Sequence, residues 1–267
     1  MAPVVALALA CTRVTEPLPE IGATVITPLP QYALWWSLAE SCSGLKRDFS
    51  EIRWLSDPSS AVRTQAGSAD TVVGEWFDAT SSIVLARDYL ANAAVVRHEM
   101  LHALLRSSGH PAVPFRDGCA GYVVCDGACA RSVGALTGAG AGAPRLPVDS
   151  LIVTQRLFPE RISFVRDKEG WFALVVEVSN PKPYPVWARL RAFPGRPNVS
   201  ATFGYTTAAG SQQSEVTGDS MSFAARETKR MVFDLSARQY LAAYGSPAIR
   251  GFFNATQLPE RRLEIEN

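Results

Sequence analysis

Apolar residues follow two different periods along the first half of the chain. In residues 32–43 they recur at helical spacing, and the segment runs up to Gly44, so we expect a helix that ends there. Short runs rich in β-forming residues predict three strands, at residues 51–55, 71–77 and 81–86. Helices and strands mixed in this way indicate an α+β domain over residues 30–133.

A second helix is expected over residues 93–107. Asn92 precedes it and is a favourable N-cap residue. The segment AAVVRHEMLHALLRS is apolar on nearly every side, which predicts a central, buried helix. Gly109 stands where a left-handed C-cap would end the helix, and Pro111 prevents the helix from resuming.

The second half of the chain is dominated by short β-rich runs. A Gly- and Ala-rich stretch at residues 134–148 has no periodicity and is interpreted as a linker between domains. Seven β-rich runs separated by Pro, Gly, Asn and Ser follow within residues 149–257, with one short helix at 237–244. This spacing predicts an all-β, immunoglobulin-like sandwich, followed by a charged tail at 258–267.

Composition narrows the possible partners. Apolar residues make up 47% of the chain and charged residues 19%, which describes a globular protein able to bury a core. The formal net charge of +1 gives no reason to expect a nucleic acid or an acidic membrane surface as partner. No apolar run after the first dozen residues is long enough to cross a bilayer as a helix.

The N-terminus resembles the end of a bacterial lipoprotein signal. Residues 2–10 (APVVALALA) are small and apolar and lead to Cys11, the position that would carry lipid. Residues 1–29 are therefore interpreted as a truncated lipoprotein signal and a Pro- and Thr-rich tether. We expect an exported protein, periplasmic or at the cell surface, whose membrane contact is a lipid anchor at Cys11.

The remaining cysteines are even in number, which agrees with export. Cys42, Cys119, Cys125 and Cys129 can form two disulfides in three possible pairings. The last three could instead ligate a metal, but their spacings differ from the paired C-x-x-C of zinc ribbons. Disulfides are the favoured interpretation, with the pairing left open.

All three histidines of the chain lie between positions 98 and 110. His98 and His102 frame the run HEMLH and, on a helix, project from one face a turn apart. This is the spacing with which a helix offers two nitrogen ligands to one Zn²⁺ ion, and Glu99 between them is placed to take a proton from a water on the metal. Two core histidines bonded to backbone are the alternative, but burying both rings and a carboxylate without an ion would be costly.

The helix resembles the active-site helix of the zincin metallopeptidases. The resemblance covers about residues 30–130, and its specific part is the HExxH motif. It implies that His98 and His102 ligate zinc, that Glu99 is the general base, and that strand 81–86 is the edge strand along which extended substrates lie.

The third ligand departs from the known zincin branches. Between His102 and Glu160 the chain has no glutamate, and Ser108 stands where a metzincin has its third histidine. His110 comes two residues later and is our first candidate, with Asp117 as the main rival and Asp126 behind it. The string RHEMLHALL…GHP…F…C also resembles a group of uncharacterised bacterial lipoproteins, and this favours His110.

The sequence therefore predicts a zinc metallopeptidase that acts on a peptide or protein substrate. Tyr122 is either an oxyanion-stabilising residue, a role zincins often give to Tyr or His, or an aromatic residue in a disulfide-braced loop. The alternative function is a non-catalytic cell-surface binding protein with a closed, structural zinc site.

Overall fold

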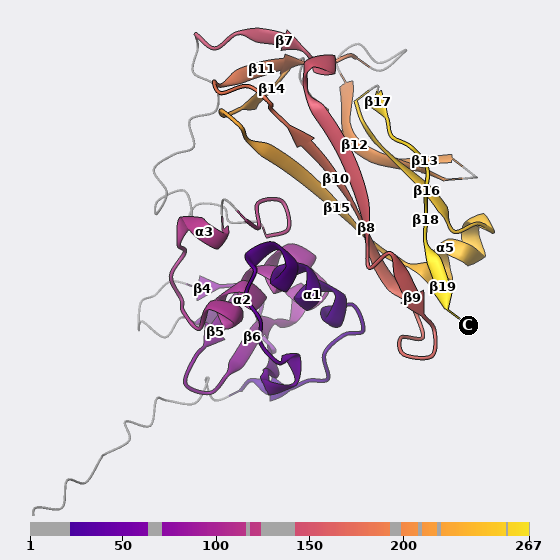
Figure 1. Ribbon diagram of the computed structural model, residues 1–267. Coiled ribbons are helices and arrows are strands. Elements are labelled where there is room, and N and C mark those ends of the chain that lie inside the picture. Colours follow the sequence, from indigo (N-terminus) through magenta and orange to yellow (C-terminus); the bar gives the residue numbers. More distant parts are fainter. Residues whose placement is uncertain are drawn as a thin grey trace, which may run out of the picture.

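Helices and a small sheet form the N-terminal part of the molecule, and long strands form the C-terminal part (Figure 1). The structure, a computed structural model, describes residues 22–63, 71–115, 118–123, 142–192, 199–207, 210–217, 220–254 and 256–266. Cys11, Asp117, Cys125, Asp126 and Cys129, and with them the predicted lipid anchor, lie outside these ranges. No helix in the described ranges has the length and apolar character needed to cross a membrane.

The N-terminal sheet has the strand order β1-β2-β6-β5. Its two central strands are parallel, and each outer strand is antiparallel to its neighbour. The strands are β1 (Thr24–Val25), β2 (Arg53–Asp57), β6 (Ser82–Ala86) and β5 (Gly74–Phe77), while β3 (Val62–Arg63) and β4 (Thr71–Val72) form a separate pair.

The expectation that residues 81–86 form the edge strand is wrong. All five residues of β6 are buried, because the strand pairs on both sides, with β2 and with β5. The edge of this sheet on the side of α2 (Ala93–Leu105) is β5. A continuous apolar run is typical of an interior strand, and the zincin resemblance had assigned this one to the edge.

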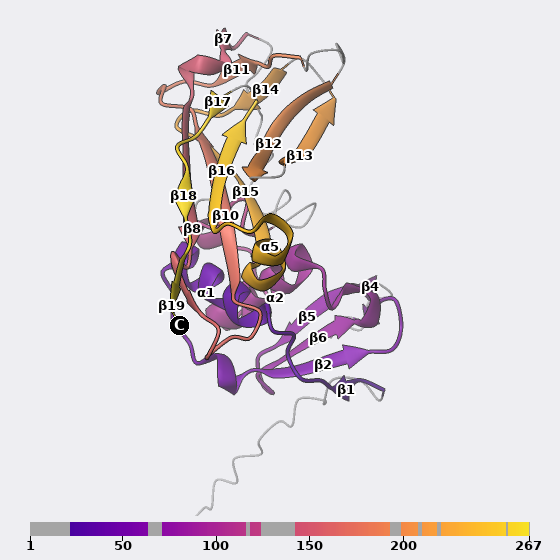
Figure 2. The same ribbon diagram turned by 90° about the vertical axis from the view of Figure 1, so that its right-hand side faces the viewer.

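Two helices cover one face of this sheet (Figure 2). The first, α1 (Tyr32–Ser43), ends at Gly44 in the left-handed conformation, as its sequence predicted. The second, α2, begins after Asn92, whose side chain accepts hydrogen bonds from the backbone of Ala94 and Val95. Short 3₁₀ turns at Phe49–Glu51 and Arg87–Tyr89 and the short helix α3 (Ala112–Phe115) complete this part.

The end of α2 differs from the prediction. The helix stops at Leu105, and Arg106, not Gly109, adopts the left-handed conformation with φ 52°. The left-handed region costs a residue with a side chain on the order of 1 kcal/mol. The chain nevertheless turns at Arg106, three residues before Gly109, where the left-handed conformation would have cost nothing.

The C-terminal part consists mainly of antiparallel strands in three larger sheets, ordered β15-β10-β8, β14-β11-β7 and β13-β12-β16-β17. The α+β class is therefore confirmed, whereas an immunoglobulin-like topology stays a prediction. The elements are β7 (Arg145–Pro147), β8 (Ile152–Phe158), β9 (Arg161–Ser163), β10 (Trp171–Ser179), β11 (Val186–Arg189), β12 (Val199–Thr207), β13 (Gly210–Thr217), β14 (Ser220–Phe223), β15 (Thr228–Ser236), α5 (Ala237–Tyr244), β16 (Ala248–Phe253), β17 (Thr256–Gln257), β18 (Arg261–Arg262) and β19 (Glu264–Glu266), with a 3₁₀ turn at Val148–Ser150.

Two segments expected to lack regular structure contain strands. Residues 145–147, at the end of the expected linker, form β7 and pair in parallel with β11. Within the expected tail at 258–267, β18 pairs with β16 and β19 pairs with β9. Leu258 and Leu263 are buried in the C-terminal core, which explains why this charged segment is held in place.

Strand β10 is buried on both faces and joins the two parts of the molecule. Leu174 and Val176 on one face belong to the core of the C-terminal sheets. Ala173 and Val175 on the other face belong to the core that α1 and α2 form with the N-terminal sheet. The sheet β15-β10-β8 is therefore the middle layer, with the N-terminal helices on one side and the other C-terminal strands on the opposite side.

Candidate metal centre

Helix α2 and the turn after it bring the three histidines together. His98 and His102 lie one turn apart on α2, and His110 folds back toward them from beyond the helix. Their Nε2 atoms form a triangle in which each of the three separations is 3.1 Å. Within the described residues, these three form the cluster of side chains arranged to hold a metal ion.

Hydrogen bonding among the imidazoles cannot account for this triangle. A hydrogen bond needs one nitrogen that carries a proton and one that does not. Around three mutually contacting atoms, at most two contacts can meet this condition, so the third always joins two donors or two acceptors. Three nitrogens that converge in this way satisfy a single cation, which accepts a lone pair from each.

The tautomer of His102 also agrees with metal binding. Its Nδ1 lies 2.8 Å from the carbonyl oxygen of Ser107, and since a carbonyl only accepts, Nδ1 carries the proton. Nε2 of the neutral ring therefore has a free lone pair directed at the other two histidines. Burial, followed by the charge that His98 would carry, lowers the pKa of His102 to about 3, and burial lowers the pKa of His110. Both rings are then neutral, as ligation requires.

The turn at residues 106–109 is what returns His110 to the helix. With Arg106 in the left-handed conformation, the backbone N–H of Ser107 donates to the carbonyl oxygen of His102 at 3.3 Å. The hydroxyl of Ser107 accepts from the N–H of Gly109 at 3.1 Å. Ser107 thus orients His102 through its carbonyl and holds the turn through its hydroxyl, which couples the position of His102 to that of His110.

Phe115 contacts all three imidazoles. Its ring centroid lies 5.3 Å from that of His98 and 4.9 Å from those of His102 and His110. The ring is buried, so it excludes water from one side of the cluster and limits the rotation of the three rings. No sequence pattern assigns Phe115 a function, because only its contacts, which the fold creates, distinguish it from other core phenylalanines.

The dimensions of the triangle fit a tetrahedral metal ion. Three nitrogens at 2.0–2.1 Å from one Zn²⁺, at tetrahedral angles, lie about 3.3 Å apart. The observed 3.1 Å separations are close to this value. His102 is buried, whereas His98 and His110 are half-buried, so the cluster is partly open to solvent. The rival ligand Asp117 lies outside the described residues.

Glu99 is buried between α2 and the edge strand β5. Its carboxylate accepts a hydrogen bond from the backbone N–H of Trp76. Gly74 makes this close approach possible, since a Cβ there would lie 2.9 Å from Cγ of Glu99. Burial, with a smaller contribution from the charge of Glu75, raises the pKa of Glu99 from 4.5 to about 8.

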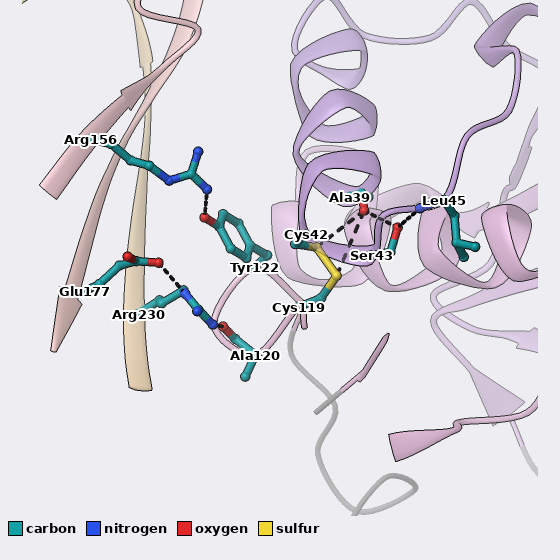
Figure 3. Close-up of a disulfide and its surroundings, with 10 residues drawn as sticks. All are labelled: Ala39, Cys42, Ser43, Leu45, Cys119, Ala120, Tyr122, Arg156, Glu177 and Arg230. Carbon is teal, nitrogen blue, oxygen red and sulfur yellow. Dashed lines mark hydrogen bonds and ion pairs between the residues drawn. A yellow bond between two sulfur atoms is a disulfide. The ribbon is translucent and has the colours of Figure 1, made fainter. Parts of the chain in front are cut away.

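Tyr122 lies at the junction between the two parts of the chain (Figure 3). The residue is buried, and its hydroxyl accepts a hydrogen bond from the guanidinium of Arg156 on β8. The guanidinium carbons of Arg156 and Arg230 lie 5.7 and 5.8 Å from the centre of the tyrosine ring. The Tyr122 side chain therefore anchors its loop to the sheet, in agreement with the structural interpretation of this residue.

The disulfide Cys42–Cys119 joins the end of α1 to the same loop (Figure 3). This is one of the pairs that the sequence allowed, and it confirms that the chain contains a disulfide. Cys119 follows Phe115 by four residues, so the bond anchors the segment that leads away from His110 and Phe115.

Comparisons with known proteins add no functional information. No protein-family model matches the chain, and no curated protein matches it significantly. Among solved structures, an alkylpurine DNA glycosylase, AlkC, of Pseudomonas fluorescens bound to DNA with an abasic site analogue is 12% identical, with a TM-score of 0.24 over 49% of this chain and 33% of the other. A β-glucosidase from Listeria innocua in complex with glucose is 14% identical, with a TM-score of 0.23 over 44% and 16%. The chain thus spans a third or less of each, and similarity at this level carries no argument about fold or activity.

Proposed function

We propose that this protein is a zinc-dependent peptide hydrolase. The observation that carries the proposal is the triangle of three Nε2 atoms, each 3.1 Å from the other two, with Glu99 directly after the first ligand on the same helix. Imidazole nitrogens suit several transition metals, and three of them with an open fourth position are typical of catalytic zinc.

His98, His102 and His110 would hold the ion, and a bound Zn²⁺ supplies Lewis acidity and a lowered pKa for a water in the open position. The charge of a bound ion would lower the pKa of Glu99 again, and its carboxylate would then take the proton from the attacking water and deliver it to the nitrogen of the leaving amine. The Nδ1–H of His102, bonded to Ser107, keeps that ring in the ligating tautomer throughout. An extended peptide substrate would lie along the edge strand β5, next to Glu99.

Export of the protein is part of the same proposal. The disulfide Cys42–Cys119 is of the kind that forms and persists in oxidising compartments. Together with the lipoprotein-like pattern that ends at Cys11, it supports a location in the periplasm or on the cell surface, with a lipid anchor.

The deciding experiment separates metal binding from hydrolysis. Wild-type protein, Glu99→Gln and the control Glu264→Gln are loaded with Zn²⁺ and mixed with quenched-fluorescent peptides of randomised sequence. We expect Glu99→Gln to retain one Zn²⁺ per chain and to lose hydrolysis by at least about 100-fold, within the range of a lost general base. Glu264, an exposed residue on β19 that pairs with Arg161, belongs to the C-terminal part of the chain, and its variant should match the wild type. Full hydrolysis by Glu99→Gln contradicts the mechanism.

A structural zinc site in a non-catalytic binding protein is the second candidate. One observation favours it: the carboxylate of Glu99 already bonds to the N–H of Trp76, which could be its only task. A structural site has four protein ligands and no exchangeable water. Zinc binding without hydrolysis in the wild type, together with loss of metal in Asp117→Ala, would support this alternative over the peptidase.

A further inference from the structure

Arg97 and Asp234 form a buried ion pair between the metal-binding helix and the middle sheet. Arg97 directly precedes His98 on α2, and its Nη1 lies 2.9 Å from Oδ2 of Asp234 on β15, 137 residues further along the chain. The two side chains are only 7% and 15% exposed. A buried charge that loses its partner is costly, so this contact holds the helix against the sheet tightly.

The pair controls the orientation of α2 about its axis. Successive residues on a helix project about 100° apart, so Arg97 faces the sheet while His98 faces the metal centre. Any rotation of α2 that redirects His98 and His102 would also pull the guanidinium away from Asp234. The Arg97 guanidinium also lies 5.9 Å from the ring of Trp35 on α1, which restricts it from a second side.

The segment that carries the third ligand is attached to the same strand. Arg230, four residues before Asp234 on β15, donates from Nη1 to the carbonyl oxygen of Ala120 at 3.2 Å (Figure 3). Residues 230, 232 and 234 share one face of the strand because side chains alternate. Val232, between the two charged residues, packs against the N-terminal core. One face of β15 therefore contacts both α2, with two histidines, and the loop that follows His110 and Phe115.

We propose that Arg97 and Asp234 are positioning residues of the metal centre, and that the face of β15 formed by Arg230, Val232 and Asp234 sets the relative placement of its ligands. This inference rests on the proposed metal site but not on peptide hydrolysis. The C-terminal part is then a structural component of the metal centre, since the sheet aligns three histidines that all lie on α2 or on the turn after it.

Cobalt binding to the full-length protein tests the inference. Co²⁺ occupies the same kinds of site as Zn²⁺, and its visible absorption reports coordination geometry. Dissociation constants and spectra are measured for the wild type, Asp234→Asn, Asp234→Glu, Arg97→Met and Arg97→Lys. The control is Arg191→Met, which breaks an ion pair between side chains that are 61% and 59% exposed, remote from α2.

Asp234→Asn and Arg97→Met should weaken Co²⁺ binding about tenfold, the lower end of the range for residues that orient metal ligands, and should change its absorption spectrum. Arg97→Lys, which keeps the charge, should recover part of the loss, and Arg191→Met should behave as the wild type. Asp234→Glu keeps the negative charge but displaces it by one methylene group. This variant tests the inference if the neutral variants do not fold, and we expect it to weaken Co²⁺ binding about threefold.

Wild-type affinity and an unaltered spectrum in the folded variants would overturn the inference alone. A wild type that binds no Co²⁺ or Zn²⁺ would overturn the metal centre and the inference with it. A wild type that binds Co²⁺ but hydrolyses no peptide contradicts only the proposed function, and the variants then still decide the inference.

Discussion

The imidazole Nδ1 of His102 donates a hydrogen bond to the carbonyl oxygen of Ser107 at 2.8 Å, five residues further along the chain. The bond exists because Arg106 turns the chain in the left-handed conformation directly after α2. The same turn brings Nε2 of His110 to 3.1 Å from Nε2 of His102. The orientation of His102 and the approach of His110 are therefore consequences of one local backbone geometry.

Loss of any one histidine should abolish stoichiometric zinc. His98→Ala, His102→Ala and His110→Ala each remove one of three ligands, and we expect affinity to fall by more than the roughly 100-fold that changes around a metal site can cause. Metal content after dialysis, measured by mass spectrometry, checks this. Asp117→Ala is the comparison, and it should keep its zinc. If His110→Ala retained stoichiometric zinc and Asp117→Ala lost it, Asp117 would be the third ligand in place of His110.

Substitution of Arg106 should reveal the strain in the turn. Arg106→Val places a β-branched residue at φ 52° and should lower the free energy of unfolding by about 1–2 kcal/mol and weaken zinc binding. Arg106→Gly adopts this conformation freely and should be tolerated in both respects. Urea unfolding and zinc titration of the two variants make the comparison, and equal behaviour of valine and glycine would contradict it.

Phe115→Ala should affect stability and metal binding together. Removing a buried ring costs about 3–5 kcal/mol, and the ring also restrains three imidazoles. Because zinc binds the folded state, saturating metal should restore part of the lost stability. Thermal unfolding with and without zinc measures this effect. Phe223→Ala, in the other core and in a different sheet, on β14, is the control that should lose stability without weakening zinc binding.

Reduction of the disulfide should destabilise the metal-binding part. The bond closes a sequence separation of 77 residues, and its loss should cost about 2–5 kcal/mol. Unfolding of Cys42→Ser and of reduced wild-type protein checks the value. Mild reductant should lower the free energy of unfolding of the wild type but not that of Cys42→Ser, which lacks the bond. An equal effect of reductant on both proteins would contradict this prediction.

Tyr122→Phe distinguishes an anchoring residue from a catalytic one. The hydroxyl bonds to the charged Arg156, so its removal should cost about 1–3 kcal/mol of stability. Since that hydroxyl is already engaged with β8, we expect kcat on the peptide mixture to stay within about twofold of the wild type. A fall in kcat of about 100-fold, as when an enzyme loses one oxyanion-stabilising donor, would instead support the catalytic role of Tyr122.

Features set by short-range chemistry could be predicted from the sequence. Helix α1 and its end at Gly44, the start of α2 at Asn92, and the placement of His98 and His102 on one face depend on neighbours within a few residues. The end of α2 could not be located in the same way. Gly109 was the favoured cap by residue type, but the helix ends at Leu105 with Arg106 in the left-handed conformation, and this turn places His110 within 3.1 Å of His102.

The sequence by itself determined which residues are candidates for the metal site, because helical periodicity and the HExxH spacing are local properties of the chain. Only the tertiary structure decided which other residues complete this site and hold it in place. The approach of His110, the cover by Phe115, the interior position of β6 and the pairing of Arg97 with Asp234 join segments that are distant or separated by turns. Such contacts depend on which buried surfaces pack together. Because many residues from distant segments contribute to each buried surface, no single stretch of sequence specifies these contacts.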